Sequence, residues 1–290
     1  MLLEKSVVEC IRQRFSCRKY LEEPIPLEKR RGLISCINSL PAGPFGGLAD
    51  FHLVAADEND RSALKDLGTY GFIQGATGFI VGTAGNHAKN LEDYGYQMEQ
   101  IILYATSIEL GTCWLGGSFT RSSFAKKISA NDEAIIPAVT SIGTIIDIQQ
   151  ARNGLLRRQI KADQRLPWET LFFNGSFEKP LSQQNAGDYT IPLEMLRIGP
   201  SASNKQPWRV LKDGSVWHFY LQRTKGYREG SLNRFLGIVD IQRLDMGIAM
   251  CHFEMTAREL GLNGQWLAET PRIQVSDDLM EYSVTWSVRP

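Results

Sequence analysis

The sequence of 290 residues predicts an α+β protein built from two similar halves. Three observations favour this fold class. Helical and strand patterns occur in both halves, a hairpin signal stands in the second half, and the two longest helical segments match each other across a fixed shift. We expect the first half, with a C-terminal arm, to span residues 1–180 and the second half to span residues 181–290.

The composition is typical of a globular protein in a reducing compartment. Hydrophobic residues make up 43% of the chain and charged residues 22%, which supports a packed core. The formal net charge is zero, so bulk charge predicts attraction neither to nucleic acid nor to a membrane. Five cysteines without paired spacing argue against a disulfide framework.

Two further patterns bear on location. The start of the chain has no long apolar core, so we expect no signal peptide. The most apolar run, residues 134–146, is too short to cross a bilayer. Together with the cysteine usage, these patterns predict a cytoplasmic protein.

The first half alternates short helices, strands and one long helix. Residues 92–110 have the longest helical pattern, with apolar residues at the spacing of a buried face, and Gly111 is expected to end this helix. The other elements that we expect are helices over residues 6–13 and 27–40, a loop over 41–47, and strands over 51–55, 79–83 and 135–146.

An arm and a second set of elements follow. Residues 149–177 are polar and irregular, but their aromatic side chains need burial, so we expect an ordered arm. The pair Asp213-Gly214 between two apolar runs predicts a hairpin. The other expected elements are a helix over residues 191–198, a long helix over 240–260 that ends at Asn263-Gly264, and a strand over 282–288.

The two long helical segments match each other when the first is shifted by 152 residues. Seven identities result, against roughly one or two expected by chance, which indicates an internal repeat. The alternative is two unrelated amphipathic helices that each end at Gly and Trp. The matched pairs are Asp93/Asp245, Gly95/Gly247, Met98/Met250, Ala105/Ala257, Leu110/Leu262, Trp114/Trp266 and Leu115/Leu267.

Residues 200–208, Pro-Ser-Ala-Ser-Asn-Lys-Gln-Pro-Trp, form the most distinctive stretch of the chain. Prolines at both ends hold the backbone extended and remove two amide donors. Ser, Asn and Gln side chains between them offer donors and acceptors that can read the edge of a flat heterocycle. The alternative is a Pro-bounded surface loop that precedes a strand.

A second candidate stretch follows the first helix. Arg14-x-Ser16-x-Arg18 places two guanidinium groups around a hydroxyl, which suits a phosphate group. Arg165 is a third candidate cation, far along the chain. The alternatives are a solvated basic turn for the first stretch and a surface arginine beside Pro167 for the second.

Both stretches resemble signature segments of the FMN-dependent nitroreductase superfamily. P-S-x-x-N-x-Q-P-W is similar to the segment that touches the flavin bound mainly by the other subunit. Arg14, Ser16, Arg18 and Tyr20 fall on the FMN phosphate segment of that family. Leu115-Gly116-Gly117 falls where the family places backbone amides near the flavin ring. Arg165-Leu166-Pro167 resembles its C-terminal phosphate segment, except that Asp163 stands where a basic residue is common; Lys161 is a substitute.

The distribution of these segments implies a particular architecture. The phosphate segment occurs once, in the first half, and the P-S-x-x-N-x-Q-P-W segment occurs once, in the second half. A nitroreductase dimer has both in each subunit. The resemblance therefore implies the tandem branch of the superfamily, with two halves fused into an intramolecular pseudo-dimer. We expect one complete FMN site and, opposite it, a site without FMN.

The resemblance implies an FMN-dependent oxidoreductase that passes a hydride from NADH or NADPH through FMN to a nitroaromatic, a quinone or a similar small acceptor. We expect the cofactor to be held by Arg14, Ser16, Arg18, Gly116, Gly117, Arg165, Pro200, Ser201, Ala202, Asn204 and Gln206. No catalytic side chain is required, because the flavin carries the chemistry. The alternatives are a flavin-binding or flavin-sensing protein without activity, and a pseudo-enzyme without flavin.

The remaining motifs predict little chemistry. The four histidines form no paired ligand motif, so we expect no metal site. Cys17 lies between candidate phosphate ligands, where basic neighbours could lower its pKa, but a small packing residue is the simpler interpretation. We expect a monomer that acts as a pseudo-dimer, with further association left open.

Overall fold

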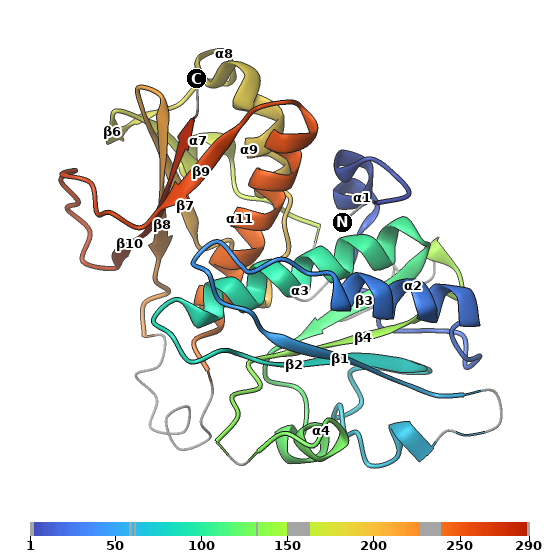
Figure 1. Cartoon of the computed structure of the whole chain (residues 1–290). Helices are drawn as coiled ribbons and strands as arrows, with labels where there is room; N and C mark the ends of the chain where they lie inside the picture. The colour runs from blue at the N-terminus through green and yellow to red at the C-terminus, as the bar shows by residue number, and fades with distance from the viewer. Residues whose placement is uncertain are drawn as a thin grey trace.

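The structure is a computed structural model that describes residues 3–57, 60, 62–131, 133–149, 163–226 and 239–288. Figure 1 shows two sheets with two long helices between them, one helix from each half. The elements of the first half are α1 (Val7–Gln13), α2 (Leu27–Asn38), β1 (Asp50–Ala55), η1 (Ser62–Leu64), β2 (Gly78–Thr83), α3 (Asn90–Ser107), β3 (Leu110–Leu115), α4 (Arg121–Lys127) and β4 (Val139–Thr144).

The arm and the second half contribute the remaining elements. These are α7 (Trp168–Leu171), β5 (Phe172–Asn174), β6 (Ser176–Pro180), α8 (Gln183–Ala186), η2 (Gly187–Tyr189), α9 (Thr190–Arg197), η3 (Ala202–Asn204), β7 (Trp208–Asp213), β8 (Val216–Gln222), α11 (Ile241–Glu259), β9 (Gly264–Leu267) and β10 (Met280–Val288).

The two sheets repeat one strand order in the part of the chain that the structure describes. The first sheet runs β1-β2-β4-β3, and the second contains β7-β8-β10-β9 in the corresponding places. All these neighbours pair antiparallel. The predicted fold class, an α+β fold with two pseudo-symmetric halves, is therefore confirmed.

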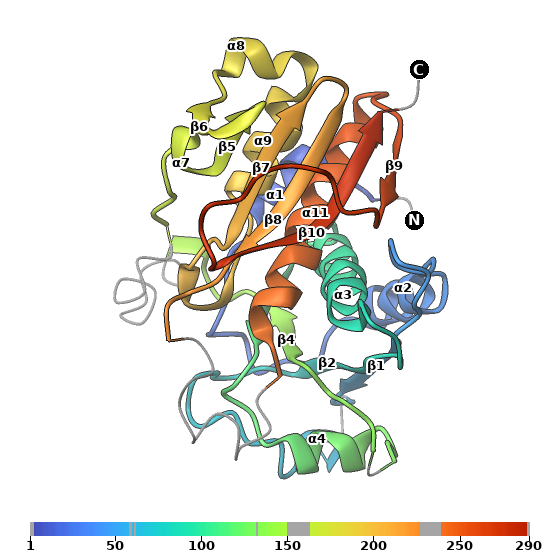
Figure 2. The ribbon, with the colours of Figure 1, turned by 90° about the vertical axis from the view of Figure 1, so that its left-hand side faces the viewer.

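The arm extends the second sheet instead of remaining irregular. β5 pairs parallel with β7, and β6 pairs antiparallel with β5 at the sheet edge. The aromatic residues of the arm become buried or half-buried in this way: Phe172 is fully buried, and its ring lies 4.5 Å from that of the half-buried Trp168. The arm therefore connects the two halves through a sheet, and Figure 2 shows it beside β7.

Two short strands were missed in the sequence analysis. α3 and α11 end at Ser107 and Glu259, before the glycines expected to end them, and β3 and β9 follow almost at once. Each helix is followed by a residue in the left-handed region, Glu109 with φ 62° and Gly261 with φ 75°. These two residues are related by the shift of 152, so both helix ends repeat as well.

The two halves meet where α3 and α11 cross. A Cβ on Gly95 would lie 2.3 Å from the Leu244 carbonyl oxygen, and one on Gly247 would lie 2.1 Å from the Glu92 carbonyl oxygen. The contacts are reciprocal, because Glu92 and Leu244 are also 152 residues apart. Arg243 adds an ion pair with Glu92, at 2.5 Å, across the same crossing. The crossing is therefore a close backbone contact on a pseudo-two-fold axis.

None of the helices in the described residues combines the length and the apolar character needed to cross a membrane. The same residues hold no group of three or more His, Cys, Asp or Glu side chains placed to bind a metal ion.

Candidate functional site

The loop of residues 200–207, here called the second-half loop, joins α9 to β7 and has a strained backbone. Ser203, Asn204 and Gln206 have φ values of 50°, 56° and 49°. The left-handed region costs a residue with a side chain about 1–2 kcal/mol, least for Asn. Such strain persists only where the surroundings hold the backbone in place, and it concentrates at functional sites.

Hydrogen bonds from a buried carboxyl group hold the start of this loop. The Ala202 amide donates to Asp245 Oδ1 at 3.0 Å, and the Gln206 amide donates to Ser201 Oγ at 2.8 Å. Asp245 is 2% exposed, and burial raises its pKa to about 8. Its Oδ2 is buried without a hydrogen-bond partner among the described residues. The carboxyl group is therefore neutral through most of the physiological range.

The arm packs against the other side of the loop. The Leu166 amide donates to Gln206 Oε1 at 2.8 Å, and Asn204 Nδ2 donates to the Gln164 carbonyl at 2.9 Å. Arg165 donates to Asn204 Oδ1 at 3.4 Å and to the Ile198 carbonyl at 2.8 Å. In the structure, the amide groups of Asn204 and Gln206 thus hold the arm to the loop. Their expected contact with a cofactor stays a prediction.

Gly116 lies beside the N-terminus of α11, and Gly117 follows it in the chain. A Cβ on Gly116 would lie 3.0 Å from Ile241 Cδ1, whereas one on Gly117 would meet nothing within 4 Å. Ile241 and Asp245 are four residues apart and therefore lie on one face of α11. Through this face, the two glycines that follow β3 in the first half are brought near the second-half loop.

The segment Arg14-x-Ser16-x-Arg18 runs beside β3. Ser16 pairs in parallel with Thr112 in an isolated bridge. The chain then leaves β3, because the Arg18 carbonyl accepts from the Gln74 amide and Tyr20 pairs with Ile145. Arg18 Nη1 is buried without a partner among the described residues, so it can donate a hydrogen bond to a bound anion. Arg14 lines a cavity of about 560 Å³ together with Gly111 and Thr112.

A buried network links Arg14 to the second half. Arg14 Nε lies 3.7 Å from Glu99 Oε1, and the other oxygen of Glu99 accepts from Trp114 Nε1 at 2.7 Å. His252 Nε2 lies 2.9 Å from Glu99, and its Nδ1 lies 2.9 Å from the Met195 carbonyl. Because a carbonyl only accepts, Nδ1 carries a hydrogen, and the Nε2–Glu99 contact needs a second proton on one of the two groups.

The predicted site residues therefore fall into two groups. Gly116, Gly117 and Arg165 lie with the second-half loop, which holds Pro200, Ser201, Ala202, Asn204 and Gln206. Arg14, Ser16 and Arg18 form the other group, in which Ser16 pairs with Thr112 of β3 and Arg14 lines a cavity with Gly111 and Thr112. The distance along β3 from Thr112 to Gly116 is roughly 13 Å at the usual rise per residue. An elongated cofactor could reach both groups, but the cavity that Arg14 lines does not include the loop.

Several residues of this region were missed from the sequence. Asp245 was noticed only as a repeat partner of Asp93, and Glu99 and His252 were not assigned a role. Polar residues amid the buried face of a long helix were the available signal. Lys161, the substitute proposed for Asp163, lies outside the described residues. Burial raises the pKa of Cys17 to about 11, so its thiol stays protonated at neutral pH. This favours the interpretation of Cys17 as a packing residue over that of a reactive thiolate.

The residues present fit FMN in two respects. Arg18 offers a buried donor that has no partner in the described parts of the chain, and the space at Gly117 leaves backbone open to a flat ring. Asn204 and Gln206 fit less directly, because their amides already bond to the arm and to each other.

Comparison with known proteins identifies the class. A family model described as "Putative TM nitroreductase" matches residues 6–257, so the chain belongs to this family of nitroreductases. A crystal structure of a putative nitroreductase from Thermotoga maritima is 18% identical, with a TM-score of 0.63. The match covers 100% of this chain and 97% of that chain, and it shows the same fold over the full length.

Shorter structures also match. A putative nitroreductase in complex with FMN from Desulfovibrio desulfuricans is 22% identical, with a TM-score of 0.40, and the match covers 53% of this chain and 95% of that one. Another in complex with FMN, from Exiguobacterium sibiricum, is 14% identical, with a TM-score of 0.40, and the match covers 50% of this chain and 90% of that one. The search of curated proteins found no match.

Proposed function

We propose that this chain is an FMN-dependent NAD(P)H oxidoreductase with one flavin site between its halves. The observation that carries the proposal is the junction at α11. Ile241 touches Gly116 of the first half, and Asp245, one turn later, holds the second-half loop. Gly116 of the first half and the loop of the second half thus both lie at the N-terminal end of α11.

The chain's own residues would hold the cofactor at two ends. Arg14, Ser16 and Arg18 would bind the phosphate, because guanidinium groups make charge-assisted hydrogen bonds to phosphate oxygens. Arg165, expected from the sequence at the phosphate, bonds to Asn204 and the Ile198 carbonyl and would act at the end of the second-half loop. Backbone amides near Gly117, Ser201 and Ala202 would face the ring. Asn204 and Gln206 would act by fixing the loop and the arm, through the bonds that they already make.

FMN would supply the redox chemistry, taking a hydride from NADH or NADPH and passing electrons to a nitroaromatic, a quinone or a similar small acceptor. The protein would leave one face of the ring accessible and position donors at its edge. Protons can come from water, so no catalytic side chain is assigned. A monomer suffices, because both halves of the site belong to one chain.

The first test is the visible spectrum of the purified protein with added FMN, before and after anaerobic addition of NADH or NADPH. We expect flavin absorption near one equivalent per chain, and bleaching by at least one of the two nucleotides. Bound flavin that does not bleach would contradict the reductase and favour a flavin sensor. A protein that takes up no FMN would contradict the cofactor assignment itself.

A pair of variants tests the phosphate site. Arg18→Met removes a guanidinium whose buried Nη1 has no partner among the described residues, and Arg12→Met removes an exposed one on α1. We expect the first variant to bind FMN about 10-fold or more weakly, since charged hydrogen bonds are worth about 1.5–3 kcal/mol, and the second to bind it as the wild type does. Equal FMN affinity in both variants, measured by fluorescence titration, would remove Arg18 from the site.

A further inference from the structure

Arg121 is a half-buried cation at the glycines that follow β3. Its Nη2 donates to the Gly116 carbonyl at 3.2 Å, and its Nε donates to the Ile136 carbonyl at 3.3 Å. The guanidinium carbon lies 4.9 Å from the centre of the Phe119 ring, in a cation–π contact. Two carbonyl oxygens and an aromatic ring therefore hold this guanidinium group in one orientation.

No carboxylate compensates the charge of Arg121 in the part of the chain that the structure describes. The ionisable group whose charge acts on it is the phenol of Tyr70, which is neutral when protonated. Burial lowers the pKa of Arg121, because a cation that is partly removed from water is destabilised when no opposite charge lies nearby. Arginine nevertheless stays protonated in proteins, so a bound anion would offset this cost.

The remaining nitrogen of Arg121 can be reached by a ligand. Nη1 donates to no atom of the described residues, and it is not among the buried polar atoms that lack a partner, so solvent reaches it. The surroundings are open as well: Tyr70 is 69% exposed, and its hydroxyl lies 3.5 Å from Thr120 Oγ1. An anion can therefore bind at Nη1 without displacing a hydrogen bond that Arg121 already makes.

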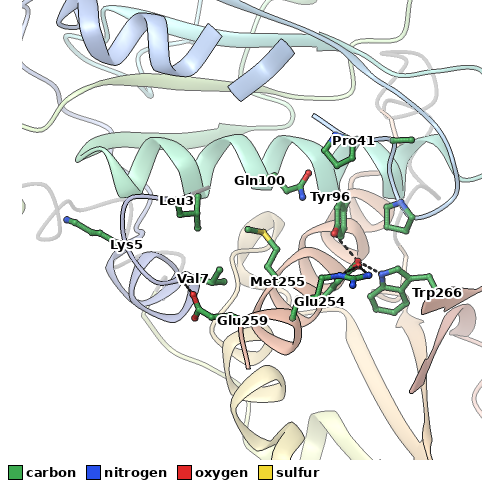
Figure 3. A pocket seen from close by; sticks show the side chains of 13 residues that line it. Leu3, Lys5, Val7, Pro41, Tyr96, Gln100, Glu254, Met255, Glu259 and Trp266 are labelled. Atoms are coloured by element: carbon green, nitrogen blue, oxygen red, sulfur yellow. Dashed lines mark hydrogen bonds and ion pairs between the residues drawn. The ribbon is translucent and has the colours of Figure 1, made fainter. Parts of the chain in front are cut away.

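An arginine on the other side of the interface shows the contrasting arrangement. A cavity of about 660 Å³ lies there beside the first-half loop (residues 41–47), and Arg258 lines it. Arg258 Nη2 forms an ion pair with Glu254 Oε1 at 2.6 Å, and Glu254 Oε2 accepts from Trp266 Nε1 at 2.5 Å (Figure 3). Arg258 thus has a carboxylate of its own chain as partner, whereas Arg121 has none among the described residues.

The place of Arg121 relates this anion site to the proposed flavin site. Its guanidinium group bonds to the Gly116 carbonyl, and the backbone of the next residue, Gly117, has open space around it. The proposed function, on which this inference rests, puts the flavin ring at these glycines. A substrate that stacks on the ring there and binds Arg121 must carry its anionic group close to its reacting atoms.

This requirement favours the acceptor over the nucleotide donor. In NADH and NADPH a ribose separates the nicotinamide ring from the nearest phosphate, whereas a compact aromatic acid carries its carboxylate directly on the ring. A guanidinium fork matches a carboxylate in geometry and charge. We propose that Arg121 binds the carboxylate of the aromatic acceptor, so that the acceptor of this enzyme is an anionic compound.

A matched pair of acceptors tests the charge requirement. 4-Nitrobenzoate and 4-nitrobenzamide have similar shapes, and only the first is anionic at neutral pH. Without NADH or NADPH neither is reduced, so calorimetry with the FMN-loaded full chain measures binding alone. We expect the wild type to bind 4-nitrobenzoate about 10-fold or more tightly than 4-nitrobenzamide, because a charge-assisted hydrogen bond forms only with the carboxylate. Equal affinities, or binding of neither compound, would overturn the proposal.

Variants of α4 locate the effect. Arg121→Met should weaken binding of 4-nitrobenzoate about 10-fold or more and leave that of 4-nitrobenzamide unchanged. Arg121→Gln is also neutral but can still donate to a carbonyl; it should behave in the same way, and it serves if Arg121→Met does not fold. Lys126→Met, which removes an exposed cation from the same helix, should change neither affinity. An unchanged preference for 4-nitrobenzoate in the Arg121 variants, or a loss of that preference in Lys126→Met, would overturn the proposal.

The reduction of the flavin separates the acceptor from the donor. If Arg121 served the phosphates of the nucleotide, Arg121→Met would raise about 10-fold the concentration of NADH or NADPH that gives half the maximal bleaching rate, and this result would overturn the proposal. A chain that takes up no FMN, or flavin that neither nucleotide bleaches, would contradict the proposed function and this inference with it. Flavin that binds and bleaches in a chain with equal affinities for the two acceptors would overturn this inference alone.

Discussion

The first-half loop and the second-half loop occupy the same place in their halves, and each is held by an aspartate at the same position of the following long helix. Asp93 accepts from the Phe45 amide at 2.9 Å and from the Gly47 amide at 2.7 Å, one bond on each oxygen. Asp245 accepts on one oxygen only. Both oxygens of Asp93 are thus bonded to its loop, whereas Asp245 keeps one buried oxygen without a partner in the part of the chain that the structure describes.

The backbones of the loops differ in the same sense. The first-half loop places glycine at its positive φ angle, Gly46 at 83°, where glycine costs nothing. The second-half loop places Ser203, Asn204 and Gln206 at such angles. One loop turns without strain, while the other keeps side chains at strained positions. This difference indicates that the second-half loop is shaped for a task beyond connecting two elements.

The largest expected effect is a loss of stability on substituting the two glycines at the crossing of α3 and α11. It tests the pseudo-two-fold symmetry on which the comparison of the two loops depends. Gly247→Ala and Gly95→Ala each place a methyl group against the backbone of the other long helix, at 2.1 Å and 2.3 Å. We expect each to lose about 3 kcal/mol or more of unfolding free energy, because backbone cannot move aside cheaply. Denaturant unfolding measures this loss.

The control for this pair is Gly117→Ala, which meets nothing within 4 Å and should change stability by less than about 0.5 kcal/mol. Gly→Ala inside a helix ordinarily stabilises by about 0.5–1 kcal/mol. A gain of that size in either crossing variant would show that the halves are not packed through these glycines. A loss in only one would show that the crossing is not reciprocal.

The same repeat shows how far the sequence could predict the fold. The long helices and the hairpin at Asp213-Gly214 have strong periods and turn chemistry, and both were predicted. β3 and β9 were missed because only a short connection with one left-handed residue separates each from its helix, Ser107 to Leu110 and Glu259 to Gly264, so the helical pattern runs into the strand. The arm's strands are set by pairing with β7, which no local pattern records.

The sequence predicted which residues belong to the site better than it predicted which partners those residues contact. The shift of 152 paired Asp93 with Asp245, but which carboxyl oxygen finds a partner depends on loop backbones that differ in sequence. Likewise, Gln100 and Glu254 line one cavity with Pro41, and only tertiary packing brings these three segments together.

The second expected effect separates the two aspartates by the size of their pH dependence. Burial raises the pKa of both, but the Phe45 and Gly47 amides and His87 oppose the shift at Asp93. The pKa of Asp245 is about 8 in the folded chain, above its unfolded value of about 3.9, so the folded state binds this proton more tightly. Its contribution to stability is therefore fully present below about pH 4. It declines by up to about 1.4 kcal/mol per pH unit toward pH 8.

Asp245→Asn removes this decline and still offers an acceptor to the Ala202 amide. We expect the variant to be more stable than the wild type at pH 8. The difference in unfolding free energy in favour of the variant should be smaller at pH 5. Asp93→Asn is the matched control. Its amide has one acceptor oxygen for two donors, and it should lose about 1–3 kcal/mol at neutral pH. Unfolding at pH 5, 6.5 and 8 checks both, and parallel curves for the two variants would contradict the distinction.

The smallest expected effect concerns the strain itself. Ser203→Gly relieves a left-handed serine at φ 50°, and Gly46→Ser introduces one at φ 83° with open space around it. Removing the strain stabilises the folded chain by about 1–2 kcal/mol. Glycine also gives the unfolded chain more conformational entropy, which offsets about 0.4–1 kcal/mol of this gain. We expect a gain near 0.5 kcal/mol for the first variant and a loss of similar size for the second.

If strain in the second-half loop serves a ligand, Ser203→Gly should also weaken FMN binding while raising stability, whereas Gly46→Ser should leave FMN binding as it is. A Ser203→Gly protein that gains stability and keeps full FMN affinity would mean that the strained loop is not needed to hold the flavin.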